Sequence, residues 1–102
     1  MSGAVLVTGS SRGIGAASAL RLARDGYDIC VNYVHDQEAA AAVVGQIQQL
    51  GQRACAVRAD VSDESQVEAL FKQADRELGA LHGLVNNAGI LLPQMRVEEM
   101  SA

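Results

Sequence analysis

The chain has 102 residues, of which 49% are apolar and 20% are charged, and its formal net charge is −4. This length suits one small domain, and the composition is that of an ordinary globular protein. The acidic balance argues against a nucleic-acid backbone as partner, because such binding needs a basic face.

No apolar stretch approaches the roughly 20 residues that a membrane span requires, and nothing at the start resembles a signal peptide. The two cysteines, Cys30 and Cys55, show neither a C-x-x-C spacing nor a nearby histidine pair. We therefore expect a cytoplasmic protein with buried thiols, no metal, and no membrane or nucleic acid among its partners.

The first half of the chain alternates between a strand pattern and a helix pattern. AVLVTG, residues 4–9, is a short apolar run that ends in turn residues, which is typical of a buried strand. Apolar residues at helical spacing follow, and Gly26 closes this predicted helix. YDICVNY, residues 27–33, predicts a second strand, and Asp36 is placed to cap a second helix that ends before Gly51.

The second half repeats this alternation. RACAVRAD, residues 53–60, predicts a third strand, and Ser62 or Asp63 opens a third helix that ends at Gly79. LHGLVNN, residues 81–87, predicts a fourth strand. The order β-α-β-α-β-α-β predicts the α/β class: a Rossmann-type doubly wound parallel sheet with strand order 3-2-1-4.

The loop after the first predicted strand has the glycine spacing G-x-x-x-G-x-G, formed by Gly9, Gly13 and Gly15. In this fold, ligands bind beyond the carboxyl ends of the strands, where the strand order reverses. Glycine permits positive φ, and its missing Cβ lets a pyrophosphate approach the N–H groups at a helix start. The spacing indicates a dinucleotide-binding loop; a glycine-rich turn without ligand and a methyl-donor site stay open as alternatives.

Two other predicted strand ends carry polar residues. Asp60 ends the third strand, where its carboxylate could accept a hydrogen bond from an adenine amino group or cap the next helix. Asn87 follows the fourth strand and could touch a ribose, and Gly89 would let the chain pass close to it. The stretch NNAG by itself is also a common bend.

Together these segments resemble the short-chain dehydrogenase/reductase family, and the resemblance covers almost the whole chain. TGSSRGIG (8–15) is similar to its cofactor loop, ADV (59–61) to its adenine contact, and NNAG (86–89) to the segment bordering the cofactor. The branch that contains 3-oxoacyl-carrier-protein reductases and bacterial glucose dehydrogenases is the most similar. The resemblance implies that residues 1–102 are the N-terminal part of a longer NAD(P)-binding Rossmann domain.

The loop, the strand ends and the resemblance give one set of candidate cofactor-binding residues: Gly9, Ser10, Ser11, Arg12, Gly13, Ile14, Gly15, Asn32, Tyr33, Asp60, Val61, Asn87, Ala88 and Gly89. An NAD site usually places an acid at the end of the second strand. Here Asn32 and Tyr33 stand there, and the nearest acid, Asp36, is a predicted helix cap. In the family, a basic residue at the position of Arg12 often pairs with a 2′-phosphate, whose geometry suits a guanidinium. We therefore predict NADP in preference to NAD; a solvated loop cation is the alternative for Arg12.

The resemblance implies hydride transfer between a nicotinamide and a small-molecule carbonyl or alcohol, carried out with a tyrosine, a lysine and a serine. The two tyrosines of this chain, Tyr27 and Tyr33, have no lysine four residues on, so no catalytic residue is assigned here. We expect the cofactor-binding half of an NADP(H)-dependent oxidoreductase that is homo-oligomeric when intact. The alternatives are a stand-alone dinucleotide-binding module without catalysis and a fragment that dimerises through an exposed strand edge.

Overall fold

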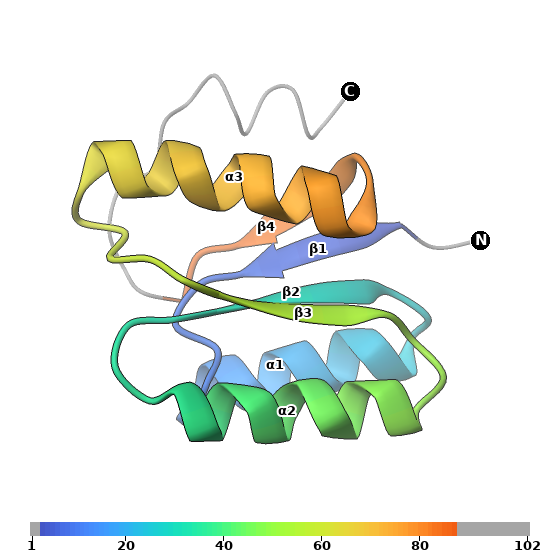
Figure 1. The fold of residues 1–102 in the computed structure, drawn as a ribbon. Coiled ribbons are helices and arrows are strands. Elements are labelled where there is room, and N and C mark those ends of the chain that lie inside the picture. The colour runs from blue at the N-terminus through green and yellow to red at the C-terminus, as the bar shows by residue number, and fades with distance from the viewer. Residues whose placement is uncertain (1–2, 88–102) are drawn as a thin grey trace.

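A computed structural model describes residues 3–87, which form a parallel sheet of four strands connected by three helices (Figure 1). The strands are β1 (Ala4–Val7), β2 (Asp28–Tyr33), β3 (Ala54–Arg58) and β4 (Leu81–Val85). The helices are α1 (Gly13–Arg24), α2 (Gln37–Gln49) and α3 (Glu64–Leu78). Their order along the chain and the strand order β3-β2-β1-β4 confirm the predicted Rossmann-type sheet.

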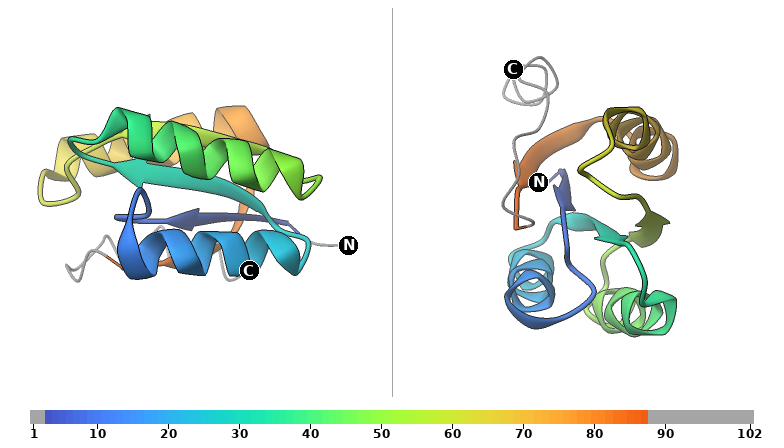
Figure 2. Two further views of the ribbon diagram at one scale, coloured as in Figure 1. Left: turned by 90° about the horizontal axis from the view of Figure 1, so that it is seen from below. Right: turned by 90° about the vertical axis from the view of Figure 1, so that its left-hand side faces the viewer.

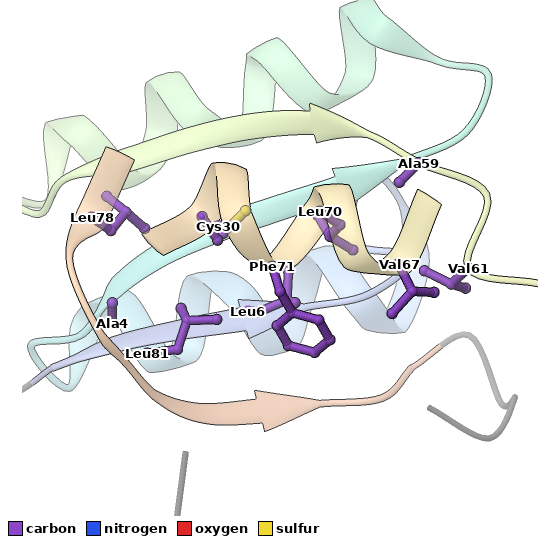
Figure 3. Packing of buried hydrophobic residues seen from close by; sticks show 11 residues of the cluster. Ala4, Leu6, Cys30, Ala59, Val61, Val67, Leu70, Phe71, Leu78 and Leu81 are labelled. Atoms are coloured by element: carbon purple, nitrogen blue, oxygen red, sulfur yellow. The ribbon is translucent and has the colours of Figure 1, made fainter. Parts of the chain in front are cut away.

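Helices cover both faces of the sheet. Figure 2 shows α1 and α2 on one face and α3 on the other. Because successive strand residues point to opposite faces, β1 sends Val5 and Val7 toward α1 and α2, and Leu6 toward α3. Figure 3 shows the cluster on the α3 side, where Phe71 is 1% exposed. Burial on both faces explains why these strands read as continuous apolar runs.

The predicted turn signals lie at the ends of the helices. Gly26, Gly51 and Gly79 follow the three helices with φ of 102°, 89° and 82°, a region that glycine enters without strain. Asp36 caps α2 by accepting a hydrogen bond from the Ala39 N–H at 2.9 Å. At α3 the cap is Asp63, of the two residues proposed, and its carboxylate accepts bonds from the N–H groups of residues 65 and 66. None of the helices in residues 3–87 has the length and apolar character needed to cross a bilayer.

Side chains connect the sheet to α3 at the amino-terminal ends of the strands. The Asp28 carboxylate accepts hydrogen bonds from the Arg53 backbone N–H at 2.8 Å and from Arg53 Nε at 3.1 Å. Arg53 Nη2 also donates to the Leu78 carbonyl at 3.1 Å, at the last residue of α3. A cation is favourable there because carbonyl oxygens concentrate negative charge at a helix C-terminus.

At the carboxyl edge, the loop after β1 is bonded to two neighbouring strands. The Thr8 N–H donates to the Val85 carbonyl at 3.0 Å, and the Ser10 N–H donates to the Asn32 carbonyl at 2.9 Å. The loop between β1 and α1 is therefore held over the ends of β2 and β4. It occupies the place where the strand order reverses, which is the ligand edge of this fold.

Candidate functional site

The glycines of the loop have two different uses. Gly9 and Gly13 have φ of 59° and 62°, so both take the left-handed conformation that the turn requires. A Cβ on Gly13 would have nothing within 4 Å, which means that the loop surface is open at this point. On Gly15, a Cβ would overlap the Gly9 carbonyl oxygen and lie 2.7 Å from Asn87 Nδ2. Gly15 therefore lets α1 pack against the loop, whereas Gly13 leaves room outside it.

Two asparagines from different strand ends hold the backbone of Gly9. Asn32 Oδ1 accepts a hydrogen bond from the Gly9 N–H at 3.0 Å, and Asn87 Nδ2 donates to the Gly9 carbonyl at 3.2 Å. Asn32 lies on β2 and Asn87 follows β4. The loop is thus held from both sides, because the N–H and the carbonyl of Gly9 each bond to an asparagine side chain.

Asn32 is 1% exposed, and its amide is engaged inside the protein. Besides accepting from Gly9, the side chain donates through Nδ2 to the Ala59 carbonyl at 3.1 Å and to the Val57 carbonyl at 3.4 Å. The sequence placed Asn32 at the ribose end of a cofactor. In the structure its side chain lies behind the loop and ties β1, β2 and β3 together, a role that the sequence did not indicate.

Ser10 is also an internal residue of the loop. It is 0% exposed, its Oγ donates to the Val7 carbonyl at 2.6 Å, and the same Oγ accepts from the Asn32 N–H at 3.1 Å. Ser11 is half-buried, while Arg12 and Gly13 are exposed. The outer surface of the loop is therefore formed by Ser11 and the residues that follow it.

The N-terminus of α1 is uncapped, unlike those of α2 and α3. Its N-cap residue is Arg12, no side-chain hydrogen bond caps it, and no acid stands in its first turn. The first N–H groups of a helix have no acceptor within the helix, and the helix dipole adds positive charge there. With Ile14 78% exposed beside them, these donors lie at the surface. This arrangement suits an anion such as a phosphate.

The end of β2 carries no free acid within the described residues. Tyr33 is the last residue of β2 and is 9% exposed. Asp36, the next acid along the chain, is engaged as the cap of α2. Arg12 is exposed, and no ion pair within residues 3–87 involves it. An exposed arginine without an ion-pair partner in this part of the chain is favourable for binding a phosphate group.

Arg58 is a basic residue at this edge that is not among the predicted cofactor-binding residues. It lies opposite Tyr33 in the register of β2 and β3. Its Nε donates to the Val34 carbonyl at 3.0 Å, which holds the guanidinium beside the turn after β2. The signal in the sequence was a charged residue near the end of an otherwise apolar strand.

Asp60 follows β3 and is exposed. Its Oδ1 accepts hydrogen bonds from Ser62 Oγ at 2.6 Å and from the Ser62 N–H at 3.0 Å, and these bonds hold the pKa of Asp60 below its usual range. The carboxylate is therefore ionised at neutral pH, and Oδ2 has no hydrogen-bond partner among residues 3–87. Val61 turns inward and is 8% exposed in the cluster under α3. Asp60 thus shapes the turn before α3 and keeps one oxygen for a further donor.

The segment after β4 is described up to Asn87. Thr8 Oγ1 lies 3.2 Å from Asn86 Oδ1 and 3.4 Å from the Val85 carbonyl, so this segment and the glycine loop are in contact. Ala88 and Gly89, the last two predicted cofactor contacts, lie outside the described residues, and their roles stay predictions. Residues 3–87 contain no cluster of three or more side chains that could hold a metal ion.

An apolar groove of about 460 Å³ adjoins the loop on the side of α1 that faces β4. Its lining residues are Ile14, Ala17, Ser18, Arg21, Leu22 and Val85. Ile14 borders both this groove and the N-terminus of α1. Because the lining is mostly aliphatic, the groove suits apolar groups, whereas the adjacent loop offers backbone donors.

The comparisons with known proteins agree on one family. Residues 3–102 match the family described as short chain dehydrogenase. The chain is 50% identical over 97 residues to the uncharacterised oxidoreductase YgfF of Escherichia coli strain K12. It is 45% identical over 103 residues to the 3-oxoacyl-[acyl-carrier-protein] reductase FabG of Staphylococcus aureus strain Mu50.

These two matches cover 95% and 97% of this chain but 39% and 42% of the relatives. The chain therefore spans about two fifths of the length of these curated relatives. Among solved structures, a blue fluorescent protein from a metagenomic library in complex with NADPH aligns with a TM-score of 0.82 at 41% identity. That alignment covers 96% of this chain and 44% of the other.

Proposed function

Since the chain belongs to the short-chain dehydrogenase family, we propose that it is the cofactor-binding part of an NADP(H)-dependent oxidoreductase. When bound, the cofactor supplies or accepts the hydride that is exchanged with a small-molecule carbonyl or alcohol. The observation that carries this proposal is the uncapped N-terminus of α1 beside an open, glycine-lined loop. No catalytic residue is assigned within residues 1–102.

The loop fits the diphosphate of a dinucleotide. The N–H groups of the first turn of α1, at Gly13, Ile14 and Gly15, would donate to phosphate oxygens. Open space at the missing Cβ of Gly13 would let those oxygens come close to the backbone. Ser10 and Asn32 would act from behind by fixing the loop, because both are buried and bonded to backbone groups.

The adenosine end of the cofactor would lie over the ends of β2, β3 and β4. Tyr33 and Val61 would border it, Asp60 Oδ2 would accept from the adenine amino group, and the segment from Asn87 to Gly89 would pass beside the ribose. The alignment with a protein in complex with NADPH supports this placement at the level of the fold.

A 2′-phosphate suits this site better than a bare 2′-hydroxyl. Arg12 is exposed without an ion-pair partner in the described residues, and Arg58 is held at the turn after β2. The end of β2 has no carboxylate of its own, because the next acid along the chain, Asp36, lies beyond the turn and caps α2. A guanidinium forms charge-assisted bonds to phosphate oxygens, so we propose NADP as the cofactor in preference to NAD.

We further propose that residues 1–102 are the N-terminal part of a longer Rossmann domain in a cytoplasmic homo-oligomer. The matched relatives are more than twice as long as this chain, and their lengths support a continuing domain. Within residues 3–87, β4 pairs with β1 alone, and the apolar groove beside Val85 is open. Both features fit a sheet that continues beyond β4.

Calorimetric titration of the purified protein with NADPH and with NADH measures the two binding affinities and tests the cofactor proposal. We expect both to bind and NADPH to bind more tightly; tighter NADH binding would contradict the assignment to NADP. Turnover of NADPH with simple carbonyl compounds by the whole protein supports the oxidoreductase proposal. Binding without turnover in the whole protein would instead identify a non-catalytic dinucleotide-binding module.

A further inference from the structure

The pairing of β2 with β3 places the two cysteines of the chain side by side. Cys30 and Cys55 are Cα partners in the register of these parallel strands. Adjacent strands lie about 4.8 Å apart, which falls within the Cα separation of roughly 4.4–6.8 Å found for disulfides. The sequence predicted that both thiols are buried, and the structure buries Cys30 and half-buries Cys55. Their pairing was not predicted, because a sequence does not reveal which residues of different strands are opposite each other.

Both thiols lie on the same face of the sheet. Cys30 belongs to the buried cluster under α3, and Cys55 packs against that cluster. Figure 3 shows Cys30 within this cluster, to which Leu70 and Leu78 of α3 also belong. The cluster around the pair is apolar apart from the Glu77 carboxylate of α3, whose charge acts on both thiols. No third metal-ligating side chain joins the pair within residues 3–87. The chemistry open to this place is therefore that of a dithiol.

The two thiols differ in access and in acidity. Cys30 is 0% exposed, whereas Cys55 is half-buried on β3, an edge strand of the sheet in the described part of the chain. A hydrogen bond from Cys30 lowers the pKa of Cys55 and outweighs the opposing effects of burial and of the Glu77 charge. The same interaction, burial and the charges of Cys55 and Glu77 raise the pKa of Cys30. Cys55 is thus the more acidic and the more accessible of the two thiols, and a thiolate is the form that reacts with oxidants.

We propose that Cys55 and Cys30 form a dithiol site that a hydroperoxide oxidises to a disulfide joining β3 to β2. First, the Cys55 thiolate attacks one peroxide oxygen, the O–O bond breaks, and Cys55 becomes a sulfenic acid while hydroxide or an alkoxide leaves. Then the Cys30 sulfur attacks the Cys55 sulfur, the S–S bond forms, and the S–O bond breaks. The hydroxyl group departs as water with the proton of Cys30. The two thiols lose two electrons, and the peroxide accepts them.

Peptide mapping of the full chain after brief exposure to hydrogen peroxide tests this proposal. Free thiols are alkylated before digestion, so each cysteine is scored as reduced, sulfenic or disulfide-linked. We expect both free thiols to be lost together and a peptide pair joined through Cys30 and Cys55, lighter by two hydrogen atoms. Two reduced thiols, disulfides between separate chains, or oxidised Cys55 beside reduced Cys30 would each overturn the proposal.

Two single variants separate the steps. Cys30→Ala removes the second thiol, so the sulfenic acid on Cys55 should persist and react with a 1,3-dione probe. Cys55→Ala removes the accessible thiol, so Cys30 should stay reduced at the same peroxide dose. Rapid oxidation of Cys30 in the Cys55→Ala variant would contradict the assigned order. The peptide map of the unaltered protein decides the main claim even if a variant folds poorly.

Discussion

The helices of this small domain begin in two different ways. α2 and α3 each begin with an aspartate and have a glutamate in the first turn. The aspartate carboxylate accepts one backbone hydrogen bond from the first turn of α2 and two from that of α3. α1 begins with Arg12, has no side-chain cap, and has no acid in its first turn. Capping satisfies the free N–H groups of a helix and stabilises it, so its absence at one helix leaves donors for another anion. The N-termini of α2 and α3 are therefore stabilised within the protein, whereas that of α1 is suited to a ligand.

The largest expected difference in stability is between alanine variants of two glycines, one in α1 and one in α2. Gly15→Ala in α1 places a methyl group against the Gly9 carbonyl, so we expect the free energy of unfolding to fall by about 1–3 kcal/mol. Cofactor binding should weaken as well, because the loop must move. A Cβ on Gly45 in α2 would meet nothing within 4 Å, and Gly45→Ala should stabilise by roughly 0.5–1 kcal/mol.

Urea denaturation of both variants measures these changes. If Gly15→Ala is as stable as the unaltered chain, the contact between α1 and the loop is not as tight as described. A loss of stability in Gly45→Ala would show that α2, like α1, does not tolerate a Cβ at its glycine.

An aspartate at the N-cap of α1 should make this helix begin as α2 and α3 do. Arg12 has extended backbone angles, φ −150° and ψ 167°, which suit an N-cap aspartate. We expect Arg12→Asp to raise the free energy of unfolding by about 0.5–1 kcal/mol. It should also weaken NADPH binding at least ten-fold, about 1.4 kcal/mol, because a carboxylate competes for the same donors and repels phosphate.

Arg12→Ala is the matched control, since it removes the cation without supplying a cap. It should weaken NADPH binding less than Arg12→Asp and leave stability unimproved. Calorimetry and urea denaturation provide both readouts. NADPH binding by Arg12→Asp at the affinity of the unaltered protein would remove α1 from the proposed site.

A smaller effect is expected at the end of β3. Arg58→Ala should weaken NADPH binding about five-fold, the equivalent of about 1 kcal/mol for an exposed charge interaction, and leave NADH binding unchanged. Arg76→Ala, in the last turn of α3, removes an exposed arginine elsewhere and should change neither affinity. An equal loss for NADPH and NADH would indicate that Arg58 shapes the turn after β2 without contacting a 2′-phosphate.

The sequence was sufficient to predict the order of the helices and strands and the position of the glycine-rich loop. Apolar periodicity, Asp36 and Gly26 predict where helices begin and end, because these signals act over a few neighbouring residues. The parts that it did not reveal depend on contacts between strands. Asn32 bonds to Gly9 across β1 and β2, and Cys30 meets Cys55 across β2 and β3. Such partners are set by register, which a single sequence does not specify residue by residue.

The central claim is that the cofactor's phosphates lie against the bare backbone at the start of α1, and Gly13 tests it most directly. Gly13 and Gly51 both have positive φ, and a Cβ on either would meet nothing within 4 Å. Alanine therefore strains both positions in a similar way, but only Gly13 adjoins α1's first turn. We predict that Gly13→Ala weakens NADPH binding at least ten-fold, about 1.4 kcal/mol, while Gly51→Ala binds as the unaltered protein does. Equal NADPH affinities for the two variants, measured by calorimetry, would contradict this account.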